Sequence, residues 1–210
     1  MTYTFQVRDV VAEPYQVAPQ LTARLRVEES TGRRIHAVVL RCQVRVEPGR
    51  RRYDAVEGEA LRGLFGDRAR WVDTLKPFAW MQCHTTVQGF TGATDADLAL
   101  PCTYDLDVIG TRYLHALTAG TVPLTFLFSG TVFTRGANGF GVEHVPWDCE
   151  ARYDLPVTTW RAMIEEHFPN TGWIRVERAV LDDLAALRAR AGHLSWDETI
   201  RSLLPVEVVA

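Results

Sequence analysis

The stretch that decides the fold is residues 37–54, AVVLRCQVRVEPGRRRYD, in which apolar and polar side chains alternate before a turn. Every second residue over 38–46 is apolar or cysteine, and from Arg41 onward the residues between them are polar. Successive side chains of a β-strand point to opposite faces, so this period predicts a strand with one buried and one solvated face. The Pro-Gly pair at 48–49 predicts a turn, and the arginines at 50–52 then lie at the solvated end of the strand.

The same alternation extends to both sides of this stretch. Residues 3–7 and 21–27 carry apolar side chains at every second position, which predicts two further strands. The most hydrophobic segment, 122–134, is rich in β-branched and aromatic residues and predicts a central strand. The dipeptide Asn138-Gly139 is typical of a hairpin turn, so this strand is expected to pair with residues 140–154.

Glycine, proline and capping residues divide the rest of the chain. Gly130 inside the central strand predicts a bulge or a close backbone approach. Residues 172–178 predict a short strand, and Ser195 with Glu198 forms a capping box at a helix start. The helices predicted from apolar spacing cover residues 56–66, 111–120, 160–168, 179–192 and 196–204.

These elements predict a mainly β protein of the α+β class, an antiparallel β-sandwich or curved sheet with helices at the C-terminal end. No repeat or low-complexity linker interrupts the sequence. We therefore expect residues 1–210 to form a single β-rich domain, with residues 158–210 as a helical C-terminal portion packed on the sheet.

Composition narrows the function classes. Hydrophobic residues make up 47% of the chain, charged residues 23%, and the net charge is −3, a balance typical of soluble globular proteins. Residues 1–80 hold 14 basic and 10 acidic side chains, which is too weak an excess to favour nucleic-acid binding. No apolar run approaches the ~18 residues that span a bilayer, and residues 1–11 lack the basic and apolar regions typical of a secretory signal. We expect a cytoplasmic protein without a membrane contact.

No catalytic, metal or cofactor motif is present. The six histidines and four cysteines lack the spacing of zinc ligands, and no nucleophile or phosphate-loop motif occurs. The segment HVPWDCE places His144, Asp148 and Glu150 near one another, with Cys149 expected to face the core. These three polar residues are the predicted lining of a pocket if the protein binds a small molecule or is an enzyme.

The alternative to a small-molecule pocket is a protein-binding face formed by arginine and tryptophan side chains. Both residue types are enriched at the energetic centres of interfaces. The predicted polar contacts are Arg41, Arg45 and Arg51, and the predicted apolar contacts are Trp71 and Trp80.

Two resemblances add to these patterns. The first 55 residues, through VVLRCQVRV, resemble the opening strands of the SecB export-chaperone family. Nearly the whole chain resembles a bacterial family of unknown function and about this length. That resemblance rests on the segments LFGDRARW, VPLTFLFSGTVF, VPWDCEARYDLPV and HFPNTGWIRV. Genes of that family tend to lie near those for [NiFe]-hydrogenase subunits, which implies an accessory role.

The sequence therefore favours a non-enzymatic, protein-binding accessory or chaperone-like factor without a cofactor. The resemblance implies a hydrogenase subunit or maturation factor, or another redox complex, as its partner. A homo-oligomer stays open. Nucleic-acid binding through the arginines at 50–52 is the least favoured alternative, because the net charge is acidic. The alternative is a small-molecule-binding protein or enzyme.

Overall fold

A computed structural model describes residues 2–103, 105, 108–136 and 139–205. The chain forms two compact units, Met1–Trp173 and Ile174–Ala210. The first unit contains all the strands, and the second contains the last two helices.

The first unit holds a three-stranded antiparallel sheet in the order β1-β2-β5. Its strands are β1 (Tyr3–Ala12), β2 (Gln20–Glu29) and β5 (Ala93–Pro101). The alternation predicted for the first two strands is present, because Phe5, Leu25 and Leu98 are all buried on one face.

A five-stranded antiparallel sheet has the order β4-β3-β6-β7, with β8 also paired to β6. Its strands are β3 (Arg34–Val46), β4 (Phe78–Thr91), β6 (Thr121–Gly136), β7 (Gly139–His144) and β8 (Glu150–Pro156). The predicted pairing of 122–134 with 140–154 is confirmed, but the partner strand is interrupted between His144 and Glu150. Asn138 of the predicted turn lies outside the described residues.

The two sheets pack face to face around one hydrophobic core. Phe5 of β1 stacks on Phe128 of β6 with 4.6 Å between ring centroids, and this contact joins the sheets directly. Val38, Leu40 and Val44 of β3 face the same core and are at most 1% exposed. The predicted fold class, a mainly β sandwich of the α+β class, is confirmed.

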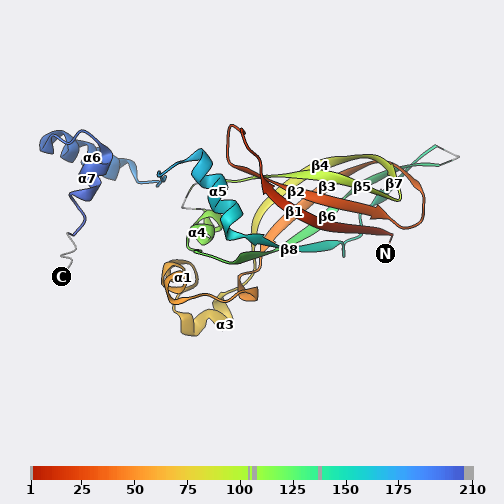
Figure 1. Cartoon of the computed structure of the whole chain (residues 1–210), viewed down its shortest axis with the longest axis horizontal. Helices are drawn as coiled ribbons and strands as arrows, with labels where there is room; N and C mark the ends of the chain where they lie inside the picture. The colour runs from red at the N-terminus through yellow and green to blue at the C-terminus, as the bar shows by residue number, and fades with distance from the viewer. Residues whose placement is uncertain (1, 104, 106–107, 137–138, 206–210) are drawn as a thin grey trace. The chain divides into compact units, whose positions relative to one another are not determined.

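Short helices lie at one end of the strands of the first unit (Figure 1). They are η1 (Pro48–Arg50), α1 (Ala55–Ala60), α2 (Arg62–Phe65), η2 (Arg68–Arg70), α3 (Trp71–Thr74) and α4 (Ile109–His115). α5 (Val157–His167) follows β8 and packs against β1, β2 and β8 through Trp160 and Met163, which are at most 1% exposed.

The predicted strand over 172–178 is wrong. Only Trp173 makes a bridge, to Asp105, and residues 174–177 are exposed and form no strand. A strand needs the backbone hydrogen bonds of a partner, which alternation alone does not supply.

The second unit consists of α6 (Arg178–Ala191) and α7 (Trp196–Arg201). The predicted N-cap is confirmed, because the Glu198 amide donates to Ser195 Oγ at 3.1 Å; the Glu198 carboxylate accepts from the Leu194 amide at 2.7 Å, one residue before the N-cap. The packing of this unit on the sheet stays a prediction. Among the helices of the described residues, none has the length and apolarity needed to cross a membrane.

The close approach of Gly130 to the neighbouring strand can be tested by substitution. Its φ is +147°, and a Cβ built there would lie 2.2 Å from the Val39 carbonyl oxygen on the neighbouring strand. Gly130→Ala should lower the free energy of unfolding by about 2 kcal/mol or more, measured by denaturant titration. Gly32→Ala is the control, since Gly32 also has positive φ but open space around it, and should cost about 1 kcal/mol. Equal losses would contradict the close approach.

A candidate binding surface on the five-stranded sheet

Strand β3 lies between β4 and β6 and turns one face outward. The residues that alternate with its buried side chains include Arg41, which is exposed, and Gln43, which is half-buried. Because β3 is paired along both edges, these side chains stand in the middle of the sheet rather than at its border.

The register aligns the outward side chains in rows across three strands. Arg41 lies between His84 of β4 and Ser129 of β6. In the neighbouring rows, Gln43 lies between Gln82 and Leu127, and Val39 between Thr86 and Thr131. Adjacent strands are about 4.8 Å apart, so each row is about 10 Å wide.

These rows form the floor of an open depression of about 930 Å³. Its lining side chains are Val39, Arg41, Gln43, Gln82, His84, Leu127, Ser129 and Trp147, which together are named here the Arg41 surface. The backbone of the core residues Cys42, Cys83 and Phe128 completes the floor.

Trp147 comes from the interruption between β7 and β8. The Val145 amide donates to the Gly130 carbonyl at 3.0 Å, and the Phe128 amide donates to the Cys149 carbonyl at 2.9 Å. Both ends of the short loop are therefore tied to β6, and Trp147 between them is 95% exposed. An indole this exposed, at the border of a polar depression, is available to a partner.

Arg41 differs from the arginines on the outer face of the other sheet. There, Arg24 pairs with Asp97 at 2.8 Å and Arg26 with Asp95 at 3.2 Å, directly across β2 and β5. Among the described residues, nothing forms a hydrogen bond or ion pair with the Arg41 guanidinium. Arg41 thus presents an uncompensated positive charge on the five-stranded sheet, whereas the two arginines of β2 are neutralised by aspartates of β5.

The other predicted partner-binding residues lie elsewhere. Arg45 is one row beyond Gln43, two rows from Arg41, and its Nε lies 4.0 Å from the Glu47 carboxylate. Trp71 is buried and donates through Nε1 to the Gly66 carbonyl at 3.1 Å. Trp80 is half-buried, and its ring lies so close to Gly110 that a Cβ there would be 2.5 Å away. Neither of these tryptophans lines the Arg41 surface.

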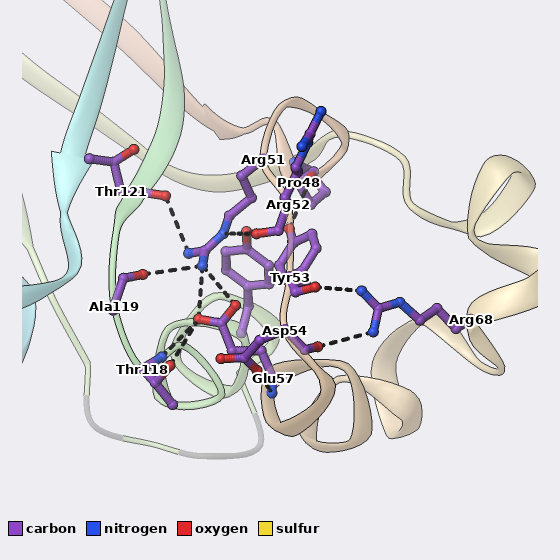
Figure 2. A network of polar contacts seen from close by, with 11 residues as sticks. Pro48, Arg51, Arg52, Tyr53, Asp54, Glu57, Arg68, Thr118, Ala119 and Thr121 are labelled. Carbon is purple, nitrogen blue, oxygen red and sulfur yellow. Dashed lines mark hydrogen bonds and ion pairs between the residues drawn. The ribbon is translucent and has the colours of Figure 1, made fainter.

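Arg51 is a structural residue and is not exposed for a partner. Its side chain is 10% exposed, and Nη2 lies 2.8 Å from both carboxylate oxygens of Glu57, which is itself 3% exposed. Figure 2 shows the guanidinium between Glu57 and the carbonyls of Ala119 and Thr121, to which it donates at 3.2 Å. The turn chemistry at 48–52 suggested a solvated arginine, but the α1 helix and the loop before β6 enclose it.

The same network continues into the core through two tyrosines. The Tyr53 hydroxyl donates to the Pro48 carbonyl at 2.8 Å and lies 2.7 Å from the Tyr113 hydroxyl. Burial raises the pKa of Tyr53 to about 12, and burial also raises the pKa of Tyr113 above its usual range. Both hydroxyls therefore stay protonated at neutral pH and act as fixed hydrogen-bond donors.

The residues predicted to line a small-molecule pocket are all exposed. The register places His144 opposite Thr131 and Glu150 opposite Leu127, four residues apart along β6. That separation is about 13 Å of strand. Asp148 lies in the loop between them, and Cys149 faces the core as expected, 5% exposed. The side chains of His144 and Glu150 are therefore too far apart to contact the same substrate atom.

The cysteines are buried or half-buried thiols. Cys42 and Cys83 are direct partners across β3 and β4, and their hydrogen bond together with burial raises the pKa of Cys42. In the described part of the chain, no three His, Cys, Asp or Glu side chains gather closely enough to hold a metal ion.

Comparison of the sequence with known protein families identifies one family. A family described as "Family of unknown function (DUF6084)" matches residues 1–209. The chain belongs to the DUF6084 family. No curated protein matches the sequence of this DUF6084 chain.

Solved structures share only slight similarity with the DUF6084 chain. β-Glucosidase from Kluyveromyces marxianus is 8% identical, with a TM-score of 0.25, over 73% of this chain and 15% of that enzyme. β-Glucosidase 3B from Thermotoga neapolitana is 13% identical, with a TM-score of 0.26, over 72% and 17%. The DUF6084 chain thus covers less than a fifth of either enzyme, and TM-scores this low carry no argument about function.

The Arg51–Glu57 pair makes a direct stability prediction for the DUF6084 protein. Arg51→Ala should lower the free energy of unfolding by about 3 to 5 kcal/mol, because it leaves the buried Glu57 carboxylate without its counter-ion. The control is Arg62→Ala, which removes exposed ion pairs to Glu59 and Asp67 in the same region and should cost at most about 1 kcal/mol. Denaturant titration measures the free energy of unfolding of both variants. Similar decreases for the two would contradict a larger contribution from the buried pair.

Proposed function

We propose that this protein is a non-enzymatic binding protein that holds an extended, acidic segment of another protein on the Arg41 surface. The observation that carries this proposal is an exposed arginine without an internal partner, fixed at the centre of a sheet beside an exposed tryptophan.

The charge of the surface supports an acidic partner. A guanidinium offers a planar pair of N–H donors that matches a carboxylate. Arg41 is flanked on both sides by uncharged or weakly basic groups, Ser129 and His84, which leave its positive charge uncompensated. A charge-assisted hydrogen bond from Arg41 to a partner carboxylate therefore needs no internal ion pair to be broken first.

The spacing of the surface supports an extended segment. Outward side chains recur every second residue along a strand, about 6.7 Å, and the same repeat separates alternate side chains of an extended peptide. Gln43 and Gln82 lie side by side in the next row and present amide donors and acceptors to such a segment. Trp147 at the border provides apolar contact area, as expected of an interface anchor.

The same register argues against nucleophilic catalysis at this place. Ser129 and His84 lie on opposite sides of Arg41, two strands apart, which is about 10 Å. A serine activated by histidine needs a hydrogen bond of about 3 Å between them. The separation of Ser129 and His84 therefore favours a role in binding a partner over a role in acyl transfer.

A small carboxylate ligand is the second candidate, favoured by the volume of the depression, about 930 Å³, which lies in the range of ligand sites. Its openness toward solvent favours the protein segment, since small-ligand sites usually enclose most of the ligand surface. The whole-chain family resemblance supports a [NiFe]-hydrogenase subunit or maturation factor as the partner. We propose that the two proteins meet in the cytoplasm. The chaperone-like role rests on the resemblance of residues 1–55 to the SecB family.

Recovery of the partner by the tagged full-length protein tests this proposal. Arg41→Ala and Trp147→Ala should each lower recovery of the same protein from the native host at least tenfold, as quantified by mass spectrometry. Arg24→Ala, on the outer face of the other sheet, is the control and should leave recovery unchanged. Addition of salt should weaken the wild-type complex.

Undiminished recovery with both variants would refute the Arg41 surface as the binding site. Stabilisation of the protein by a small dicarboxylate, lost in Arg41→Ala, together with no Arg41-dependent protein partner would instead favour the second candidate.

A further inference from the structure

The second unit, Ile174–Ala210, has an apolar surface that it does not bury. Among its described residues no hydrophobic side chain is fully buried, and Leu194, Leu203 and Leu204 are more than half exposed. A unit of this size, below about 40 residues, rarely holds itself together without a partner or cross-link. The exposed apolar surface on α6 and α7 therefore calls for a covering element.

The apolar residues of α6 follow the spacing of a helix-pairing seam. Val180, Leu184, Leu187 and Ala191 recur at intervals of four, three and four residues, and Leu194 continues the series just beyond the helix. This is the a/d spacing by which two helices pack together in a coiled coil. Val180 is 45% exposed, and Leu184 and Leu187 are half-buried, so part of the apolar surface at each of these positions is open to a second helix.

The charges that flank the seam complement a second copy of the same helix. Asp183 and Arg190 occupy equivalent flanking positions, seven residues apart. Within one helix that separation is about 10.5 Å, too far for an ion pair. In an antiparallel pair that places Leu184 of one copy against Leu187 of the other, Asp183 lies beside Arg190 of the second copy, and the symmetry produces this contact twice.

The remaining charges of α6 do not compete for these positions. Asp182 is paired with Arg178 at 3.5 Å, and the Arg188 guanidinium covers the Trp196 ring at 4.8 Å. Among the described residues, Asp183 and Arg190 have neither an ion-pair partner nor a hydrogen-bonded side-chain partner. Asp183 and Arg190, which flank one side of the seam, are thus left uncompensated within the described part of a single chain.

From the seam and its flanking charges we infer that α6 is a self-association element, and that two copies of the chain pair their α6 helices antiparallel. α7 of each copy lies beside its own α6 and adds Trp196 and Ile200 to the joint apolar core. The result is a small four-helix cluster built from two chains. This inference is independent of the Arg41 surface, which lies in the other unit.

The mass of the full-length protein in solution tests the inference, measured by sedimentation equilibrium over a range of concentrations. The wild type should form a dimer of about twice 23.7 kDa. Leu184→Glu should weaken dimerisation at least a hundredfold, because it places a charge in the seam. Ala186→Glu, on the exposed side of α6, is the matched control and should dimerise as the wild type does.

A charge exchange separates self-pairing from a purely local effect on the helix. Asp183→Arg alone and Arg190→Asp alone should each weaken the dimer at least tenfold, because each sets like charges side by side. The double variant should restore it, although the exchange opposes the helix dipole within each chain. Circular dichroism of each variant confirms that the helices are kept. A wild type that is monomeric throughout, or a double variant no better than the singles, would overturn the inference.

Discussion

The constraint on which the structure depends is the two-sided pairing of strand β3. It is bonded to β4 on one edge and to β6 on the other, so its register is set twice. Val38, Leu40 and Val44 fill the space between the sheets, and a slip of one residue would exchange them for Arg41 and its neighbours. The free energy of burying that apolar face holds Arg41 outward. The position of the candidate site is therefore a consequence of the core.

The arginines on the outer faces of the two sheets differ in their neighbours across the strands. On the three-stranded sheet each arginine of β2 faces an aspartate of β5, and the pairs Arg24–Asp97 and Arg26–Asp95 neutralise both arginines. The equivalent neighbours of Arg41 are a histidine and a serine. Cross-strand ion pairs stabilise a sheet and occupy its charged groups at the same time, and the proposed binding role rests on their absence around Arg41.

The sequence predicted local structure well, because alternation, hairpin and capping signals are local. It placed β3 with its correct buried face and predicted the pairing of β6 with the segment after it. Arg51 shows where that reasoning ends: nothing near residue 51 reveals that Glu57 and the carbonyls before β6 will enclose it. Trp147 was missed although Pro146 before it, which has no N–H to donate to a strand ladder, is a signal that the strand is interrupted there. The single strand predicted over 172–178 lacked a partner, which no local pattern could show.

Site-specific photo-crosslinking in the native host tests the central claim most directly. A photoreactive amino acid at Gln82, on the rim of the Arg41 surface, is compared with the same residue at Gln6, on the outer face of the three-stranded sheet. The account predicts that the Gln82 position captures a defined protein, that Arg41→Ala abolishes this product, and that the Gln6 position does not capture that protein. Capture of the same protein from Gln6, or from Gln82 without any dependence on Arg41, would contradict it.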